Sequence, residues 1–359
     1  MDKVRVGVIG CGAISPAYLR NMTGPFADLL EVTACADLVK EKAADRAREF
    51  GVPHVSTVDD VLSDADIEVV LNLTVPGAHF EVTMAALEAG KHVFSEKPLA
   101  VTRQEGRQIV RKAAEKRLLL AGAADTFLGA GLQTCRKLID EGAIGTLISA
   151  QAMIALRYGG ERLHKRGSGP VFDMGPYFLT AIAALLGPAT RATGSAQTPF
   201  AEKPYPPNSP DYGKTFAVET PMNVSGVLDL ARGGIAVLTA IGEVPGYHPR
   251  LEFYGTEGVL VANDPNMYTG RVVLIPKGGK EQDVPLVPGF TEQGRALGVA
   301  EMAHAIRTGR KPRAGLELML HVLDVMQAVH EASERGRHVK LRSTCERPEP
   351  FDAAELHRQ

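Results

Sequence analysis

The sequence has few cysteines, no tryptophan and almost no net charge. Its four cysteines include no C-x-x-C pair, so neither a disulfide framework nor a zinc knuckle is expected, and reduced thiols are typical of a cytoplasmic protein. They are Cys11, Cys35, Cys135 and Cys345. Forty Lys and Arg residues against forty-two Asp and Glu residues give a formal net charge of −2, which offers no basic face for nucleic acid.

Long apolar runs are absent as well. No run reaches the roughly 18 residues that a membrane-spanning helix needs, so no membrane partner is expected. Lys3 and Arg5 precede a short apolar run, but a glycine turn and a helical pattern follow it at once, unlike a secretory signal peptide. The sequence therefore predicts a soluble, cytoplasmic protein. With 359 residues, it has room for two domains of roughly 100–200 residues each.

Short apolar runs alternate with helical patterns in the first third of the sequence. Such runs are typical of parallel strands, because helices bury both faces of their sheet. A capping box, Thr102-x-x-Glu105, predicts the start of one of the helices. We therefore predict an α/β fold with an N-terminal Rossmann-type, doubly wound parallel sheet in a domain of residues 1–123. The expected strands are Val4–Ile9, Glu31–Ala36, Ile67–Leu73, His92–Ser95 and Leu118–Ala121.

The pattern changes near residue 145. Apolar and polar residues alternate from Val218 to Ser225, which indicates a strand with one solvated face. We expect one strand over Ala217–Leu230, with an edge position or a bulge at Pro221. The sequence predicts a second, α+β domain over residues 124–359 with an antiparallel sheet. Two late helices, over residues 293–307 and 316–334, are expected to cover this sheet or to pack on the first domain.

A glycine turn follows the first expected strand, with the sequence Gly10-Cys-Gly12-Ala13-Ile14-Ser15. In a dinucleotide-binding fingerprint the first glycine permits the tight turn, and the second lets the backbone approach a pyrophosphate at the helix N-terminus. The third position holds Ser15 in place of Gly or Ala, so the motif is imperfect. Its place between a strand and a helix favours a dinucleotide site that includes Ala13 and Ile14, and the alternative is a structural turn.

Asp37 ends the second expected strand, twenty-five residues after Gly12. A carboxylate at this place binds ribose hydroxyls and repels a 2′-phosphate. We therefore predict NAD as the cofactor in preference to NADP, which remains possible because Lys40 lies near. The alternative role for Asp37 is to cap the next helix.

Two polar segments follow the third and fourth strands of this sheet. Thr74-Val-Pro76-x-x-His79 follows one strand and Glu96-Lys97-Pro98 the other. Because ligands bind at the carboxyl ends of strands in such sheets, we expect both segments to lie beside the cofactor. The candidate residues are Thr74, Pro76, His79, Glu96, Lys97 and Pro98, and His79 is expected on the packing or ribose side.

Several motifs together resemble the Gfo/Idh/MocA family, named for glucose–fructose oxidoreductase, inositol dehydrogenase and rhizopine catabolism. They are Gly10-x-Gly12, Pro76 with His79, the Gly90-Lys-His-Val run before Glu96-Lys97-Pro98, Asp173-x-Gly175, and Leu251-Glu-Phe-Tyr-Gly-Thr-Glu-Gly258. The resemblance implies an NAD(P)-dependent oxidoreductase acting on a sugar, a cyclitol or a derivative. It also implies an open, mostly antiparallel second sheet through which the chain forms a homodimer or homotetramer, and often a cis peptide before Pro98.

The resemblance also implies the catalytic groups, with one departure. Lys97 corresponds to the family lysine near the nicotinamide and the substrate hydroxyl, where an ammonium stabilises developing alkoxide charge. Tyr177 stands where the family has a catalytic histidine, and Thr180 stands in place of its last aspartate. A phenol has an unperturbed pKa of about 10 and suits proton delivery to a keto carbon. Asp173 is expected to orient Lys97 or to bind a substrate hydroxyl.

The segment from residue 157 to 165 is expected to rim the substrate site, with Tyr158 and His164 as candidate substrate contacts, although a histidine in a basic loop is often only solvated. No metal site is predicted. Two alternatives stay open beside the oxidoreductase. One is an NAD-using glycosidase, in which the cofactor is regenerated in place. The other is a sensor that binds the dinucleotide without turnover, favoured by Tyr177 at the histidine position.

Overall fold

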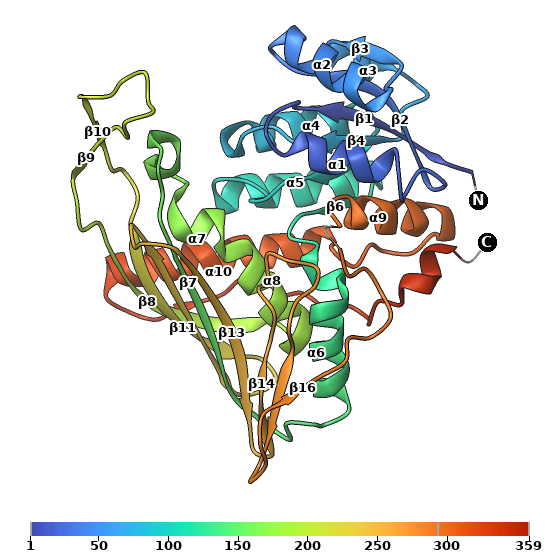
Figure 1. The fold of residues 1–359 in the computed structure, drawn as a ribbon. Coiled ribbons are helices and arrows are strands. Elements are labelled where there is room, and N and C mark those ends of the chain that lie inside the picture. Colours follow the sequence, from blue (N-terminus) through green and yellow to red (C-terminus); the bar gives the residue numbers. More distant parts are fainter. Residues whose placement is uncertain (1, 293, 358–359) are drawn as a thin grey trace. The chain divides into compact units, whose positions relative to one another are not determined.

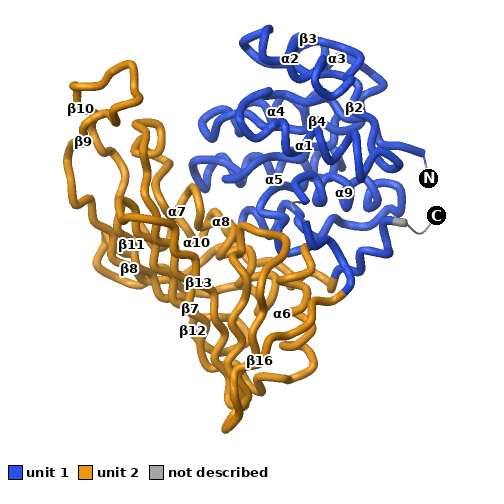
Figure 2. The backbone as a smooth tube through the Cα atoms, viewed as in Figure 1, with its two compact units in different colours: residues 1–128, 288–320, 351–359 blue, residues 129–287, 321–350 orange. Residues whose placement is uncertain are grey.

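The computed structural model describes residues 2–292 and 294–357. The chain divides into two compact units, which Figure 2 shows in separate colours. The first unit combines residues 1–128, 288–320 and 351–359, and the second combines residues 129–287 and 321–350. Among the described residues, no helix is both long and apolar enough to span a bilayer.

The first unit is built on a six-stranded parallel sheet (Figure 1). Its order is β3-β2-β1-β4-β5-β6, so the winding reverses between β1 and β4, which is where such sheets bind ligands. The predicted doubly wound sheet is confirmed. Its strands are β1 (Val4–Ile9), β2 (Leu30–Ala36), β3 (His54–Ser56), β4 (Val69–Asn72), β5 (His92–Ser95) and β6 (Leu120–Gly122).

Helices connect these strands. They are α1 (Ser15–Met22), α2 (Lys40–Phe50), α3 (Val58–Ser63), α4 (His79–Glu88) and α5 (Arg103–Lys116), with short 3₁₀ turns η1 (Pro76–Ala78) and η2 (Thr126–Leu128). The capping box at Thr102 is present, since its hydroxyl accepts the Glu105 N–H at 3.2 Å and the Glu105 carboxylate accepts the Thr102 N–H at 2.9 Å. The sequence pattern missed β3 and α3, because β3 has only three residues and none of them is buried.

The last part of the first unit returns to this sheet. Helix α9 (Leu297–Thr308) belongs to the unit, and the segment after it pairs with β6, where the Gly122 N–H donates to the Ala314 carbonyl oxygen at 3.0 Å. Residue 293, where a late helix was expected to begin, lies outside the described residues. The other late helix, α10 (Leu316–Arg335), falls mostly in the second unit.

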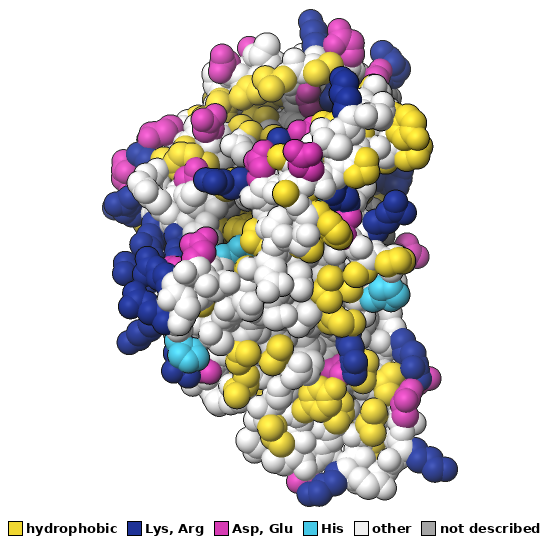
Figure 3. Space-filling view, turned by 90° about the vertical axis from the view of Figure 1, so that its left-hand side faces the viewer, with side chains coloured by type: hydrophobic (Ala, Val, Ile, Leu, Met, Phe, Trp, Pro, Cys, Tyr) yellow, Lys and Arg dark blue, Asp and Glu magenta, His cyan; other side chains and the backbone are white. Residues whose placement is uncertain are grey.

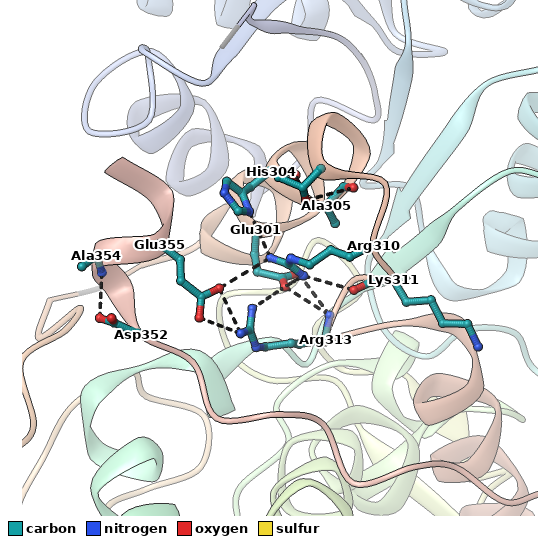
Figure 4. Close-up of polar contacts among 10 residues, drawn as sticks. Glu301, His304, Ala305, Arg310, Lys311, Arg313, Asp352, Ala354 and Glu355 are labelled. Atoms are coloured by element: carbon teal, nitrogen blue, oxygen red, sulfur yellow. Dashed lines mark hydrogen bonds and ion pairs between the residues drawn. The ribbon is translucent and has the colours of Figure 1, made fainter. Parts of the chain in front are cut away.

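A buried carboxylate fastens this returning segment (Figure 4). Glu301 of α9 is fully buried and accepts from Arg310 Nη1 at 2.5 Å and from Arg313 Nη1 at 3.1 Å. Arg313 Nη2 also donates to both carboxylate oxygens of Glu355, at 2.8 and 3.0 Å, from the 3₁₀ turn η4 (Ala353–His357). Hydrogen bonds between two charged groups, such as these, are stronger than those between neutral groups. The network therefore ties the chain's last helical turn to the first unit.

The second unit contains a nine-stranded sheet in the order β16-β15-β14-β13-β7-β12-β11-β8-β17 (Figure 1). Only β12 and β7 pair in parallel, so the expected mostly antiparallel sheet is confirmed. Its strands are β7 (Leu147–Leu156), β8 (Ala189–Gln197), β11 (Asn223–Leu230), β12 (Ile235–Gly242), β13 (Tyr247–Gly255), β14 (Gly258–Val261), β15 (Val273–Pro276), β16 (Gln282–Asp283) and β17 (Val339–Lys340).

Helices α6 (Ala130–Asp140), α7 (Gly169–Asp173) and α8 (Gly175–Leu186) complete the second unit, with the 3₁₀ turn η3 (Glu161–His164). Every residue of α8 is buried, which explains why its sequence is apolar on all sides. The short strands β9 (Glu202–Pro204) and β10 (Thr215–Ala217) form a separate antiparallel hairpin.

The single strand expected over Ala217–Leu230 was wrong. Strand β10 ends at Ala217 and pairs with β9, whereas β11 begins at Asn223 in the nine-stranded sheet, and the residues between them belong to neither strand. The Glu219 N–H donates to the His164 carbonyl oxygen at 2.8 Å, and Pro221 has no N–H to offer a neighbouring strand. The alternation of apolar and polar residues therefore continues across the break between β10 and β11 and gives no sign of it.

The predicted domains, 1–123 and 124–359, are continuous in sequence, whereas the compact units are not. The first unit extends to Leu128 and also contains α9 and the 3₁₀ turn η4. Because the pairing of residue 314 with β6 joins residues almost two hundred positions apart, local sequence patterns give no sign of it. The continuous division stays a prediction about how the chain is organised.

Candidate active site

The glycine turn connects β1 to α1 in the first unit. Gly10 has a φ of +103°, and a Cβ there would lie 2.6 Å from the Leu73 carbonyl carbon, so only glycine fits. A Cβ on Gly12 would meet nothing within 4 Å, so that side of the turn is open. Ser15, the departure from the fingerprint, closes the turn because its hydroxyl donates to the Gly12 carbonyl oxygen at 2.8 Å.

The start of α1 presents backbone donors. No side chain caps this helix, and within residues 2–292 and 294–357 no acceptor takes the N–H groups of Gly12, Ala13 and Ile14. Such groups at a helix N-terminus suit an anionic ligand. The turn therefore fits a dinucleotide: Gly12, Ala13 and Ile14 would hold its pyrophosphate through their N–H groups, and its nicotinamide would supply hydride exchange.

Asp37 follows β2 and reaches back to this turn. One carboxylate oxygen accepts the Cys11 N–H at 2.8 Å and the other accepts the Val39 N–H at 2.8 Å. The alternative that Asp37 caps α2 does not hold, since the N-cap residue of α2 is Val39. The carboxylate instead links the end of β2 to the glycine turn, where a ribose would lie beside the pyrophosphate.

The residue that organises the loop after β4 is one that the sequence analysis missed. Asn72 is fully buried, and its side-chain oxygen accepts from the Thr74 hydroxyl at 2.6 Å and from the Thr74 N–H at 3.2 Å. Its amide nitrogen donates to the His79 carbonyl oxygen at 3.2 Å. A polar residue closing the apolar run Val69–Asn72 was the available signal. Asn72 thereby fixes Thr74 and the turn that contains Pro76.

His79 joins the two polar segments. Its ring is buried, with Nδ1 at 2.7 Å from the Pro98 carbonyl oxygen and Nε2 at 3.0 Å from the Thr74 carbonyl oxygen. Burial lowers the pKa of His79, although both carbonyl contacts oppose this. Because both ring nitrogens contact backbone oxygens, His79 links the Thr74 and Pro98 segments.

The Glu96-Lys97-Pro98 segment follows β5. The Glu96 carboxylate is buried and accepts from the Tyr18 hydroxyl at 2.8 Å and from the Lys97 N–H at 3.1 Å. The Lys97–Pro98 peptide is cis, as the resemblance implied. The backbone of Lys97 is therefore fixed between the Glu96 carboxylate and the Pro98–His79 contact, and its half-buried side chain starts from the carboxyl edge of the sheet. Tyr18, on α1, was not predicted.

In the second unit, Asp173 and Tyr177 lie on consecutive helices. Asp173 is the last residue of α7 and directly precedes Met174, the N-cap residue of α8, and Tyr177 lies in the first turn of α8 and is buried. The Tyr158 hydroxyl donates to Asp173 Oδ2 at 3.1 Å. Burial, followed by the Asp173 charge, raises the pKa of Tyr158, so this phenol stays protonated and remains a donor.

His164 is fully buried and not solvated. Its Nε2 lies 2.6 Å from Glu243 Oε1, and its Nδ1 lies 2.8 Å from the Gly160 carbonyl oxygen. Lys203, on β9, forms an ion pair with the other oxygen of Glu243. Glu243 and Lys203 were not predicted, because they are 79 and 39 positions from His164 and no local motif connects them.

A second tyrosine–aspartate pair belongs to the same unit. The Tyr247 hydroxyl, at the start of β13, donates to Asp264 Oδ2 at 2.8 Å. Burial, the Asp264 charge and more weakly Tyr177 raise the pKa of Tyr247. Tyr158 and Tyr247 therefore each donate to one carboxylate of the second unit, Asp173 and Asp264. Among the described residues, no group of three His, Cys, Asp or Glu side chains is arranged to hold a metal ion.

The parallel sheet, its glycine turn and the lysine after β5 define an NAD(P)-dependent oxidoreductase. Comparison with family models agrees. Residues 4–122 match the oxidoreductase family with an NAD-binding Rossmann fold, Gfo/Idh/MocA, and residues 132–261 match the C-terminal domain of the same family. The chain belongs to the Gfo/Idh/MocA family of oxidoreductases.

Relatives extend over most of the chain. A scyllo-inositol 2-dehydrogenase (NADP(+)) of Bacillus subtilis is 25% identical over 95% of this chain and 97% of its own length. A dTDP-3,4-didehydro-2,6-dideoxy-alpha-D-glucose 3-reductase of Saccharopolyspora spinosa is 31% identical over 72% of this chain and 74% of its own. The fold matches that of levoglucosan dehydrogenase in complex with NADH and L-sorbose, with a TM-score of 0.85, 21% identity, and coverage of 95% of this chain and 99% of that one.

Proposed function

We propose that this oxidoreductase transfers a hydride between a nicotinamide cofactor and a hydroxyl or keto carbon of a sugar, a cyclitol or a derivative. The observation that carries the proposal is the fixed Glu96-Lys97-Pro98 segment at the carboxyl edge of the Rossmann sheet. The names of the relatives support the substrate class, since they include an inositol dehydrogenase and a keto-sugar reductase.

Side chains of this protein stabilise the reacting oxygen of the substrate and transfer its proton. The Lys97 ammonium stabilises the negative charge that develops on the substrate oxygen. In the reducing direction Tyr177 donates a proton to that oxygen, and in the oxidising direction the proton returns to it. Asp173 orients the reacting hydroxyl through a hydrogen bond. Hydride and proton together account for the change between carbinol and carbonyl.

A direct test mixes the purified protein with NAD and a panel of sugars and cyclitols, and with NADH and keto-sugars. We expect the NADH absorbance to rise with a polyol and to fall with a keto-sugar. Glycoside cleavage without net NADH would favour the glycosidase alternative. Dinucleotide binding with no change in any substrate would favour the sensor, for which Tyr177 at the family histidine position is the motivating observation.

Two variants test the residue roles. Lys97→Ala is expected to lower kcat by more than about a hundredfold, the usual effect of removing a group that stabilises an oxyanion. Tyr177→Phe removes one proton donor and is expected to lower kcat by about a hundredfold, within the range for general acid–base catalysis. Both proteins should bind NADH as the parent does. Full turnover by Lys97→Ala would contradict the lysine assignment, and full turnover by Tyr177→Phe would move the proton donor elsewhere.

We also propose that NAD is preferred to NADP, because the Asp37 carboxylate at the end of β2 repels a 2′-phosphate. The Bacillus subtilis relative is named for NADP(+), so the preference differs within the family. Titration of the protein with NADH and NADPH, followed by nucleotide fluorescence, measures the two affinities directly. A lower Kd for NADPH would overturn this part of the proposal.

The proposed homodimer or homotetramer forms through the face of the second unit's sheet. Val227 and Ile235 are 37% and 45% exposed on adjacent strands, and Val237 lies opposite Val227. Figure 3 shows groups of hydrophobic side chains in the lower part of the face that it draws, with few charged side chains among them. Light scattering should find a dimer or tetramer, and Val227→Lys should reduce it to monomers. A monomeric parent would refute the interface.

We propose a cytoplasmic location, which the four buried and free cysteines support. Fractionation of cells that express the tagged chain would test it. Recovery from an oxidising compartment, with disulfides formed, would contradict it.

A further inference from the structure

Two of the four cysteines lie next to each other at the glycine turn of the first unit. Cys11 stands between Gly10 and Gly12, and Cys35 lies in β2, the strand that pairs with β1. The Cys11 thiol donates to the Ala36 carbonyl oxygen at 3.6 Å, one residue along the chain from Cys35. The two thiols also share a hydrogen bond, and both are free and buried. The turn therefore contains a pair of adjacent thiols that hydride transfer does not use.

Their surroundings make the two thiols chemically unequal. The hydrogen bond from Cys35 lowers the pKa of Cys11, although burial and the Asp37 carboxylate oppose this. The charge of Arg46 adds a weaker lowering of the same pKa. The hydrogen bond and burial together raise the pKa of Cys35. Because the thiolate is the nucleophilic form, Cys11 is the thiol that reacts first, and Cys35 keeps its proton beside it.

The position of Cys11 is coupled to the N–H groups that suit a pyrophosphate. The Cys11 N–H donates to Asp37 Oδ2 at 2.8 Å, and the Gly10 N–H donates to the Ala36 carbonyl oxygen at 2.8 Å. These two contacts place the turn against the end of β2. Sulfur atoms that share a hydrogen bond lie further apart than the roughly 2.05 Å of a disulfide, so a bond between them would draw the turn toward β2. Such a shift displaces the N–H groups of residues 12–14.

We propose that Cys11 and Cys35 form a reversible disulfide when hydrogen peroxide reaches the turn, and that this disulfide blocks dinucleotide binding. The Cys11 thiolate attacks one peroxide oxygen, so that an S–O bond forms, the O–O bond breaks and the other oxygen leaves as water after protonation. The Cys35 sulfur then attacks the sulfur of the Cys11 sulfenic acid. The S–S bond forms, the S–O bond breaks, and a second water leaves with the Cys35 proton.

The two steps balance, since two thiols lose two electrons and one hydrogen peroxide becomes two waters. The inference rests on the proposed function only for the dinucleotide site, and the identity of the substrate does not enter it. A small oxidant suits this pair, because Cys11 is only 2% exposed while the Gly12 side of the turn is open. A dinucleotide bound over that side would cover the turn and protect the thiols.

Peptide mapping tests the bond directly. The purified full-length protein is treated with hydrogen peroxide, its remaining thiols are alkylated, and trypsin releases residues 6–20 and 21–40 as peptides with one cysteine each. We expect the two peptides to be recovered joined, lighter than their sum by two hydrogen atoms, and to separate after dithiothreitol. Failure to recover the joined peptides would overturn the proposal, whether the Cys11 thiol stays reduced or is oxidised to a sulfinic acid.

Protection by NADH tests whether the thiol pair and the dinucleotide site are linked. Since only the uncovered turn reacts, NADH at about ten times its Kd should slow formation of the joined peptides about tenfold. An unchanged rate of formation would overturn the link between the pair and the site.

Titration with NADH measures the consequence of oxidation. The oxidised protein should bind NADH at least about tenfold more weakly than the reduced protein, and dithiothreitol should restore the Kd. Cys35→Ala lacks both the second thiol and the hydrogen bond that favours the Cys11 thiolate, so its Kd should be the same before and after peroxide. Cys135→Ala removes a buried thiol of α6 and is the matched control, which should lose affinity on oxidation as the parent does.

Two results of these titrations would overturn the proposal. One is an equal loss of NADH affinity in peroxide-treated Cys35→Ala, and the other is an unchanged Kd in parent protein that contains the joined peptides. If the reduced parent binds no NADH, the proposed function fails, and the peptide map still decides whether the two thiols form the bond.

Discussion

The two glycines of the N-terminal turn should respond differently to the same substitution. A Cβ added to Gly12 meets nothing within 4 Å, so Gly12→Ala should leave the fold intact. The new methyl group instead occupies the side of the turn over which the pyrophosphate is expected to pass. Loss of that close approach should raise the Kd for NADH at least about tenfold, which corresponds to about 1.4 kcal/mol.

Gly10→Ala is the informative comparison. Its φ of +103° is unfavourable for alanine, and the added Cβ would lie 2.6 to 2.8 Å from backbone atoms of Leu73 and Thr74. Backbone strain of about 1–3 kcal/mol and overpacking of a similar size should destabilise the protein by about 3 kcal/mol or more. Gly10→Ala should therefore lose both stability and NADH binding.

Denaturant unfolding followed by circular dichroism measures stability, and quenching of NADH fluorescence measures binding. We expect parental stability with weak NADH binding for Gly12→Ala, and losses of both stability and binding for Gly10→Ala. Parental affinity in Gly12→Ala would show that the dinucleotide does not pass over this turn. Equal destabilisation by the two substitutions would refute the distinction drawn from their surroundings.

Three further predictions concern other parts of the chain. Glu301→Ala leaves two arginines without their buried carboxylate and should lower the free energy of unfolding by about 3–5 kcal/mol. Glu317→Ala, which breaks an exposed ion pair with Lys311, should lower it by less than about 1 kcal/mol, and equal effects in denaturant unfolding would contradict this. Burial lowers the pKa of His321, whose Nε2 accepts the Ala189 N–H. The contribution of His321 to stability is therefore present above the unfolded pKa of about 6.5 and is lost as the pH falls through the lower folded pKa. His321→Gln should flatten the pH dependence of the free energy of unfolding below about pH 6.5, and an unchanged slope would contradict the prediction. Asp37→Ser should raise the affinity for NADPH relative to NADH about tenfold, as measured by nucleotide fluorescence, and an unchanged ratio would remove Asp37 from cofactor selection.

Much of the first unit could be predicted because its signals are local. Buried parallel strands need short apolar runs, and the turn at Gly10 needs a residue without a Cβ, so both features appear within a few consecutive residues. The segment around Lys97 could be predicted for the same reason, because the end of the strand, the turn and the motif lie next to one another in the sequence. The one strand break that local patterning hid, before Asn223, arose from contacts with residues far along the chain.

The partners of the polar side chains were decided by tertiary structure alone. His164 looks like a loop histidine in sequence, yet burial and Glu243, 79 residues away, make it part of a charge cluster. The Tyr158 hydroxyl reaches Asp173 only because the end of β7 lies beside α7. The sequence by itself determined the Rossmann sheet, the glycine turn after β1 and the place of Lys97 after β5, because each depends on neighbouring residues. Only the tertiary structure decided what holds the acidic and phenolic groups, because those contacts form between segments that meet when the chain folds.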